Sequence, residues 1–384
     1  MEYVEIKKVG KVVTGNTPSK KENKYYNQNY IEFVKPSNFI SGKITNIKKG
    51  EEYLSYEGMK KGRTANKGDV LVTCIGNIGN VGIVEKKVCF NQQINAIKCN
   101  ENYINNKYLA NVIRYISPLL THMANKAVVP ILNKTQLENI KIPIFPKETQ
   151  EEIANILEII QKNIDKRKEQ LLLADKLIKS RFIEMFGDPI RNDKGWKKEK
   201  LLENVVEKVE NISKNSEIII SYIDISSINN LKNRIETYKN YYIDEAPSRA
   251  KKIINRNDIL ISTVRPNLKN IALFDIETEN KAIASTGFCI LRIKTKLNTL
   301  YLFNVLLSNS FTNELSKKEI GANYPAVTEN DIKNVKIALP PLTLQNEFAE
   351  FVTKTDKLKF EAEESLKEME NLYESLMQKF FKQN

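Results

Sequence analysis

The chain has 384 residues, which is long enough for two domains that each bury a sizeable core. Its 60 lysines and arginines exceed its 47 acidic residues, and the formal net charge of +13 suits a polyanionic partner such as nucleic acid. No apolar run approaches the ~20 residues that span a membrane, and the four cysteines are too scattered for a disulfide framework, so we expect a cytoplasmic protein.

The first half of the chain, residues 1–145, contains a clear strand signal. Gly68 and Asp69 precede the short β-branched run Val70–Thr73, a pattern that predicts a turn followed by a buried strand. The glycines of the segment 76–82 follow at a spacing that differs from the Gly-x-Gly-x-x-Gly of nucleotide-binding loops, and no helix pattern comes after them. They predict a turn between two strands.

A long helix is predicted over residues 146–187. Pro146 disfavours helix before it and permits one just after it. Apolar residues then recur by threes and fours at positions 153, 157, 160, 164, 171, 174, 178 and 185. This spacing is typical of a coiled-coil seam, and a helix of about 39 residues, roughly 58 Å, needs a partner along most of its length. The helix is predicted to end at Gly187, because Pro189 prevents its continuation.

The second half, residues 188–340, repeats the first. The strand Val70–Thr73 recurs as Ile259–Ser262, 189 positions further on. Later in each half the shift becomes 195, where Asn139–Ile142 recurs as Asn334–Ile337, so the second copy has a net gain of six residues. A repeat of this kind determines the architecture, and it predicts two equivalent globular halves.

A second long helix is predicted over residues 341–384, because the seam positions recur there 195 residues beyond the first set. A coiled-coil stripe alone is also compatible with homodimerisation. Two equivalent helices in one chain can instead pair with each other, and the duplication favours this internal, antiparallel pairing. The result would be a pseudo-two-fold repeat with one globular domain at each end.

Several segments together point to a known family. The first long helix ends in segment 181–189, which begins with Arg181 and ends in Phe186-Gly187-Asp188-Pro189. Further segments that match the same family are 14–19, 76–82, 91–96, 263–267 and 339–345. In their order and spacing, over essentially the whole chain, they resemble the specificity subunit of type I restriction-modification enzymes.

The resemblance implies an α+β fold, with two tandem, mainly-β target-recognition domains at 1–145 and 188–340. They are joined by two long antiparallel coiled-coil helices, the central spacer helix at 146–187 and the C-terminal one at 341–384. It also implies double-stranded DNA and two methyltransferase subunits as partners and, where restriction occurs, ATP-dependent translocase subunits. S-adenosylmethionine, ATP and magnesium would belong to those partners, with no cofactor in this chain.

DNA recognition needs donors and acceptors for base edges and cations for phosphates, which loops beside rigid strands can present. Candidates in the first half are Thr17, Ser19, Lys20, Lys21, Lys60, Lys61, Arg63 and Asn77. Candidates in the second half are Arg249, Lys251, Lys252, Arg265, Asn267, Lys269 and Tyr324. In so basic a chain a single surface cation is more often only solvated. Arg265 is the strongest candidate because it closely follows a strand and precedes a proline, although it could equally pair with a carboxylate.

Two rival functions are weaker. A self-contained nucleic-acid-modifying enzyme would need motifs that the sequence lacks: an Asn-Pro-Pro-aromatic methyltransferase motif, a Walker phosphate loop or clustered metal ligands. No catalytic or metal-binding residue is therefore predicted. A homodimeric coiled-coil scaffold is the other alternative. The segment 17–19 has no counterpart in the second half, where 210–213 occupies the similar place, so we expect an asymmetric bipartite DNA target.

Overall fold

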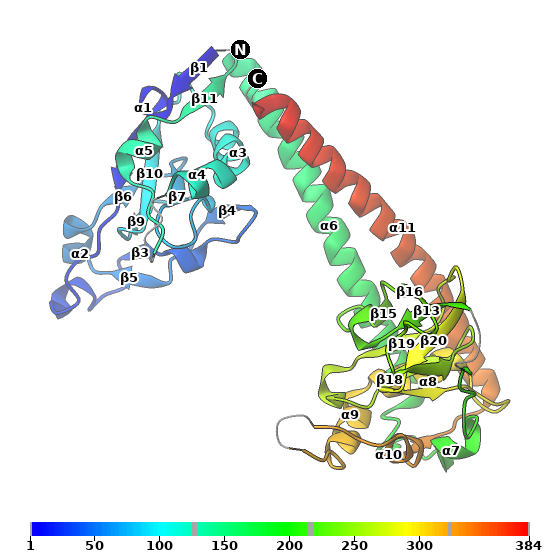
Figure 1. The fold of residues 1–384 in the computed structure, drawn as a ribbon. Coiled ribbons are helices and arrows are strands. Elements are labelled where there is room, and N and C mark those ends of the chain that lie inside the picture. Colours follow the sequence, from blue (N-terminus) through cyan, green and yellow to red (C-terminus); the bar gives the residue numbers. More distant parts are fainter. Residues whose placement is uncertain (1, 125–128, 214–217, 322–324, 383–384) are drawn as a thin grey trace. The chain divides into compact units, whose positions relative to one another are not determined.

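The computed structural model describes residues 2–124, 129–213, 218–321 and 325–382. The chain divides into two compact units. Unit 1 comprises Met1–Lys168 and Glu364–Asn384, and unit 2 comprises Glu169–Glu363. Each unit contains a β-rich domain together with segments of two long helices (Figure 1). None of the described helices is long and apolar enough to cross a membrane.

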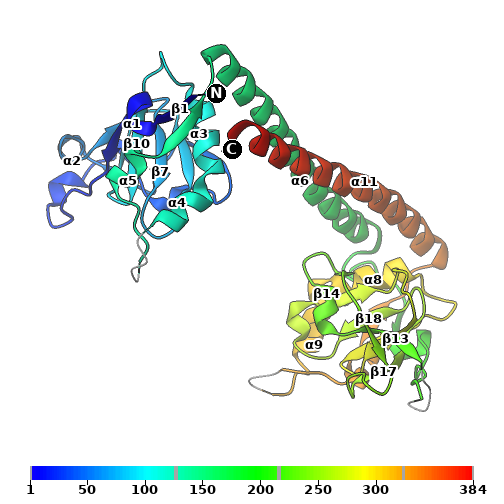
Figure 2. The same ribbon diagram turned by 45° about the horizontal axis from the view of Figure 1, so that its top comes forward.

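The two long helices are α6 (Lys147–Phe186) and α11 (Leu342–Phe381), each 40 residues long. They lie side by side in two views of the molecule (Figures 1 and 2). The seam positions predicted on α6, from Ile153 to Met185, are all buried or half-buried, and so are the matching positions on α11. Pairing therefore removes from water an apolar stripe that a single helix would expose.

Ion pairs between the helices show their direction in unit 2. Asp175 of α6 lies 2.6 Å from the Lys359 ammonium of α11, and Arg181 lies 3.3 Å from Glu347. The residue number on α11 falls as the number on α6 rises, so the two segments are antiparallel. The predicted antiparallel coiled coil is confirmed.

The described residues of unit 1 form three sheets and five short α-helices in addition to the long ones. The largest sheet has the order β2 (Gly10–Thr14), β10 (Ile94–Cys99), β7 (Val70–Thr73), β8 (Val81–Val84) and β4 (Ile44–Ile47). The second has the order β5 (Glu52–Leu54), β3 (Ile31–Val34), β9 (Val88–Phe90) and β6 (Thr64–Ala65), and β1 (Glu2–Glu5) pairs with β11 (Lys141–Ile144). The helices are α1 (Ile6–Val9), α2 (Tyr56–Lys61), α3 (Asn106–Tyr115), α4 (Ser117–Met123) and α5 (Lys134–Glu138).

Unit 2 has a four-stranded sheet in the order β16 (Lys239–Tyr242), β13 (Ile219–Ile223), β20 (Lys281–Ser285) and β17 (Ala250–Ile253). A three-stranded sheet contains β19 (Ile271–Leu273), β18 (Ile259–Ser262) and β21 (Phe288–Leu291), and two pairs are β12 (Lys198–Lys200) with β22 (Lys336–Ala338) and β14 (Ile228–Asn229) with β15 (Arg234–Ile235). The helices are α7 (Leu201–Asn204), α8 (Thr299–Leu307), α9 (Asn309–Ser316) and α10 (Glu329–Lys333).

The two domains repeat the same arrangement of strands. The sheet β5-β3-β9-β6 of unit 1 corresponds to β16-β13-β20-β17 of unit 2, and each has a parallel pair at its centre. The two strands predicted from the sequence, β7 and β18, are present and buried at every position. The predicted fold class, two mainly-β domains with a duplicated pair of long helices, is confirmed.

A buried glutamine fastens the start of each long helix to its own domain. Each glutamine accepts one backbone N–H and donates to two backbone carbonyls, so it satisfies polar groups that burial would otherwise leave without partners. Gln150 is 1% exposed and Gln345 is 0% exposed. The bonds join Gln150 with Asn105, Tyr103 and Phe145, and Gln345 with Asn298, Lys296 and Pro340.

Candidate nucleic-acid interface

In unit 1 the parallel strands β3 and β9 end at the same edge of their sheet. The backbone N–H of Asn91, which follows β9, donates to the carbonyl of Val34 at the end of β3 at 3.1 Å. The loops that begin at Lys35 and Asn91 therefore lie next to each other. Loops held in this way by rigid strands are suited to presenting recognition groups.

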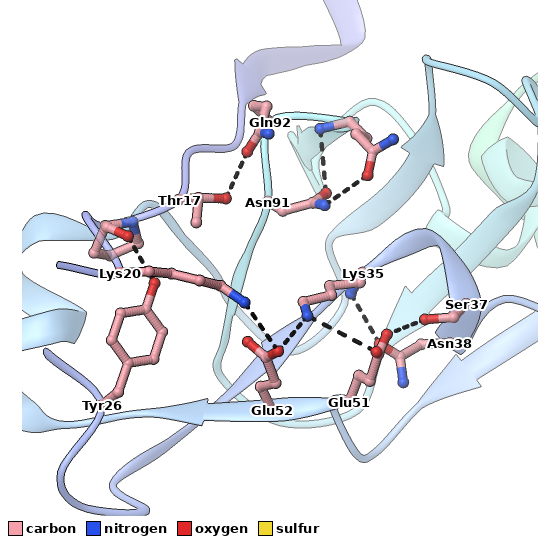
Figure 3. A network of polar contacts seen from close by, with 12 residues as sticks. Thr17, Lys20, Tyr26, Lys35, Ser37, Asn38, Glu51, Glu52, Asn91 and Gln92 are labelled. Atoms are coloured by element: carbon pink, nitrogen blue, oxygen red, sulfur yellow. Dashed lines mark hydrogen bonds and ion pairs between the residues drawn. The ribbon is translucent and has the colours of Figure 1, made fainter. Parts of the chain in front are cut away.

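Charged side chains cross this edge in a connected network (Figure 3). The Lys35 ammonium lies 2.5 Å from Glu52 and 3.8 Å from Glu51. Lys20 adds a second contact to Glu52 at 3.3 Å, and Ser37 donates to Glu51. The hydrogen bond from Lys35, helped by Lys20, lowers the pKa of the Glu52 carboxyl, which stays ionised at neutral pH. We call these five residues the charged edge of unit 1.

Other predicted DNA-binding residues lie beside the charged edge. Thr17 donates its hydroxyl to Gln92 at 2.5 Å, in the loop that follows β9 (Figure 3). The backbone carbonyl of Arg63 accepts from the N–H of Phe90 at 3.3 Å, so this exposed arginine is also near the end of β9. Exposed residues on the same loop as Thr17 are Ser19, Lys20 and Lys21. Each could meet a phosphate or a base edge.

The remaining predicted residues of unit 1 are Lys60, Lys61 and Asn77. Lys60 and Lys61 are exposed at the end of α2, where Lys60 pairs with Glu57 at 3.0 Å and lies over the ring of Tyr56 at 4.3 Å. The backbone carbonyl of Lys61 accepts from the side-chain amide of Asn16, next to Thr17, at 2.8 Å. Asn77 is exposed on the turn between β7 and β8, and this turn is the strand connection that the glycine spacing predicted.

Sequence reasoning missed Lys35, Ser37, Glu51, Glu52 and Gln92. They are separated by up to 57 positions in the sequence. The antiparallel pairing of β3 with β5 brings Glu52 beside the end of β3, and the parallel pairing of β3 with β9 adds the loop of Gln92. One signal was available, because Lys35 directly follows segment 31–34, in which three of the four residues are apolar. It did not indicate which other strand ends at the same edge.

The equivalent edge of unit 2 has different chemistry. The parallel strands β13 and β20 end there, and Asp224 stands where unit 1 has Lys35. The Asp224 carboxylate accepts from the backbone and hydroxyl of Ser226 at 2.9 and 2.6 Å. The carbonyl of exposed Arg249 accepts from the N–H of Thr286, next to the end of β20, at 2.9 Å. At this position of the edge, a cation in unit 1 is replaced by an anion in unit 2.

The loop after β18 has an unusual backbone. Arg265 and Lys269 both adopt left-handed conformations, with φ values of 49° and 50°. For a residue with a side chain this conformation costs roughly 1–2 kcal/mol. In the equivalent turn of unit 1, the left-handed residues are Gly76 and Gly79. The sequence showed the proline after Arg265 but gave no sign of this backbone strain.

The remaining candidates of unit 2 differ in exposure. Lys252 is buried, donates to the carbonyl of Phe288 and pairs with Glu329. Lys269 is half-buried and donates to the carbonyl of Leu307 at 2.8 Å, and burial lowers the pKa of its ammonium. Lys251 and Asn267 are exposed. Tyr324 lies outside the described residues. DNA contact by any of these individual residues stays a prediction.

Nothing in the described part of the chain resembles a metal centre, since no group of three or more His, Cys, Asp and Glu side chains could hold an ion there. The four cysteines are buried or half-buried, and burial raises their thiol pKa values, to about 12 for Cys74 and about 11 for Cys89. Such thiols are poor nucleophiles at neutral pH.

Two repeated β domains, each with polar and charged loops at its strand ends, define a duplicated two-domain protein with long paired helices. The family model described as "Type I restriction modification DNA specificity domain" matches residues 1–174 and again residues 195–371. The chain therefore belongs to this family, as the sequence motifs predicted. It is a specificity subunit, a non-catalytic DNA-recognition subunit that assembles with other restriction-modification subunits, and neither alternative function has support.

Individual relatives agree with this assignment. The type I restriction enzyme MjaVIII specificity subunit of Methanocaldococcus jannaschii is 25% identical over 368 residues, and the match covers 85% of each chain. The putative MjaX specificity subunit of the same organism is 28% identical over 316 residues, covering 76% of this chain and 72% of the relative. The fold is similar to the crystal structure of the S subunit from M. genitalium, with a TM-score of 0.64 at 13% identity, covering 100% of this chain and 96% of that one.

Proposed function

We propose that the chain recognises a bipartite, asymmetric DNA target, with one half-site bound by each β domain. The observation that carries the proposal is the contrast between the two equivalent edges. Lys35 with Glu51 and Glu52 occupies the edge in unit 1, whereas Asp224 with Ser226 occupies it in unit 2. Cations, carboxylates and hydroxyls form hydrogen bonds with different groups of the DNA bases. Two equivalent domains with different polar residues at their sheet edges should therefore bind two different half-sites, which favours an asymmetric target over a palindrome.

The proposal includes two methyltransferase subunits as partners, bound through the outer faces of the long helices. Large apolar side chains are exposed there in unit 2, including Leu172 at 62% and Leu173 at 53% on α6, and Leu358 at 65% on α11. Leu172 and Leu173 are adjacent, and contiguous exposed apolar surface is typical of sites that bind another protein. S-adenosylmethionine, and ATP with magnesium for a translocase, would be bound by those partners in the cytoplasm.

The main test is coexpression of the chain with its cognate methyltransferase subunit, followed by mapping of methylated adenines across genomic DNA. We expect a single motif made of two unlike half-sites separated by a constant, unspecified gap. Replacement of residues 1–145 by the matching domain of another specificity subunit should change one half-site only. A palindromic motif, or a change of both half-sites, would contradict the proposal.

The long helices can be tested separately as the element that sets the gap. Insertion of one helical turn near Asp165, with a compensating insertion in α11, should change the length of the gap and leave both half-sites intact, because helices in this proposal contact no base. An unchanged gap would show that another element sets it. A matched insertion in the exposed turn at 86–87, between β8 and β9, serves as the control and should leave the gap as it is.

A further inference from the structure

The internal repeat gives many backbone positions of one unit a counterpart in the other, and at one such pair the residue type differs although the backbone conformation is the same. Arg265 of unit 2 is the structural counterpart of Gly76 of unit 1. The backbone N–H of Arg265 donates to the carbonyl of Pro325 at 2.8 Å, and that of Gly76 donates to the carbonyl of Pro130 at 3.1 Å. The bridges that follow, Val264 with Ala326 and Ile75 with Ile131, are equivalent too. Both residues have a left-handed backbone, with φ of 49° for the arginine and 76° for the glycine.

Glycine adopts this conformation without steric cost, whereas the β-carbon of any other residue lies too close to its own carbonyl oxygen. Unit 2 therefore keeps an arginine where unit 1 uses the residue that the backbone prefers. Strain of this kind persists when the surroundings enforce it, and it concentrates at ligand-binding positions. The strain at Arg265 therefore indicates that its side chain has a function at this position.

The surroundings hold the loop in place from two sides. Asn233 donates its side-chain amide to the carbonyls of Lys269 and Ile271 at 2.9 and 3.2 Å. The Lys269 ammonium donates to the carbonyl of Leu307 at 2.8 Å and to the side chain of Asn309 at 2.7 Å. Lys269 is therefore an anchor of the loop. The anchored loop carries an exposed arginine at its start.

We propose that Arg265 recognises a guanine in the half-site bound by unit 2. This inference rests on the proposed function and assigns one base contact within it. The planar guanidinium can donate two parallel hydrogen bonds to O6 and N7 of guanine in the major groove, and this pairing needs a fixed direction of approach. A phosphate contact tolerates many side-chain directions, so it would give no reason to keep a strained, anchored backbone.

The deciding variant is Arg265→Gly, because it restores the residue that unit 1 has at this place. Asn257→Gly is the matched control. Asn257 also has a left-handed backbone, with φ of 70°, its counterpart in unit 1 is Gly68, and its loop is the turn before β18, at the opposite end of that strand. Arg265→Lys keeps the charge but removes the two-pronged geometry. All three are compared in the full-length chain, coexpressed with the cognate methyltransferase subunit.

We expect thermal unfolding midpoints of Arg265→Gly and Asn257→Gly to stay equal to wild type or to rise by roughly 1–3 °C, because both relieve backbone strain. Arg265→Gly should weaken binding of the wild-type site about 10- to 100-fold, and the methylated motif should lose its requirement for guanine at one position of one half-site. Asn257→Gly should leave the methylated motif unchanged. Arg265→Lys should fall between wild type and Arg265→Gly.

Two outcomes would overturn the assignment. Retention of the wild-type motif and affinity by Arg265→Gly would show that the side chain reads no base. A lower unfolding midpoint with the motif unchanged would show that the arginine serves the fold through a contact within unit 2. If the wild-type chain itself gave no bipartite motif, the proposed function would fail first, so the two failures are distinguishable.

Discussion

In unit 1, Gln150 joins the start of α6 to three backbone groups of its domain, and in unit 2, Gln345 makes the same three bonds at the start of α11. The two copies are chemically identical at this buried point. At the sheet edge, where both side chains are half-buried, they have opposite charges, Lys35 against Asp224. Buried polar groups have few acceptable partners, whereas partly exposed groups can change at little cost in stability.

The packing of each domain against the helices also differs. In unit 1 the phenol of Tyr373 donates to Asn111 at 2.9 Å and accepts from Arg114 at 2.7 Å. The equivalent place in unit 2 is apolar, with Ile178, and rings cluster nearby: Phe182, Phe186, Tyr301 and Phe348, with centroids 4.8–5.7 Å apart. Unit 1 also has ring contacts at this junction, with Phe381 5.5 Å from Tyr108 and 5.8 Å from Tyr115 between centroids. The difference is therefore the polar bonds of Tyr373, which unit 1 adds where unit 2 has Ile178.

The largest expected effect concerns the shared glutamines. Gln150→Met and Gln345→Met keep the side-chain volume and remove three hydrogen bonds each, so we expect each to lower the free energy of unfolding by about 3–5 kcal/mol. Calorimetric unfolding of the full chain measures this, with exposed Gln378→Met as the control. A small effect in only one copy would break the equivalence of the two junctions.

The aspartate that precedes the repeated strand, Asp69 before β7 and Asp258 before β18, has different surroundings in the two units. Asp258 accepts two hydrogen bonds from Arg292, at 2.9 and 2.7 Å, whereas burial is the main cause that raises the pKa of its counterpart Asp69 above 3.8. We expect Asp258→Asn to destabilise by about 2–4 kcal/mol because the arginine loses its partner. Asp69→Asn should change stability at neutral pH by less than about 1 kcal/mol.

The pH dependence checks the same pair. Because the folded pKa of Asp69 is raised, its carboxyl contributes stability when protonated, and this contribution is lost as pH rises through the folded pKa. The advantage of wild type over Asp69→Asn should therefore grow in acid and shrink towards neutral pH. Urea unfolding between pH 3 and 7 measures it, and the opposite slope would contradict the burial argument.

A smaller effect is expected at the polar junction of unit 1. Tyr373→Phe removes the hydroxyl that joins Arg114 to Asn111, and we expect a loss of about 1–2 kcal/mol in stability. Tyr115→Phe, in the same shallow pocket, is the control. Equal effects of the two variants in thermal unfolding would show that the bonds of Tyr373 contribute nothing beyond the packing of its ring.

The smallest effect on stability is expected at the charged edge. Lys20→Gln removes one exposed ion pair with Glu52, which contributes less than about 0.5 kcal/mol. If Lys20 meets a phosphate, DNA affinity should fall for all sequences and the salt dependence of binding should lose about one unit of slope. Lys162→Gln on α6 is the control. If Lys20→Gln leaves the salt dependence of DNA affinity unchanged in a salt titration, Lys20 does not contact a phosphate.

Periodicity and repetition predicted much of the fold from the sequence. The seam on α6 and α11 was visible because a helix that buries one face must place apolar residues every three or four positions. The strands β7 and β18 were visible because a buried strand needs a β-branched run after a turn. Both patterns are local in the sequence, so they can be recognised without knowing which residues are neighbours in the folded chain. The repeat then extended each prediction to the second copy.

The recognition surface depended on tertiary structure. The loops that carry Lys35 and Gln92 lie next to each other because β3 pairs in parallel with β9, and this pairing arises from long-range packing that no local pattern encodes. The left-handed backbone of Arg265 is likewise imposed by Pro325 and by the anchored Lys269, since an isolated arginine would avoid it. The sequence by itself determined the duplicated scaffold and its family, and the folded sheets decided which polar side chains meet.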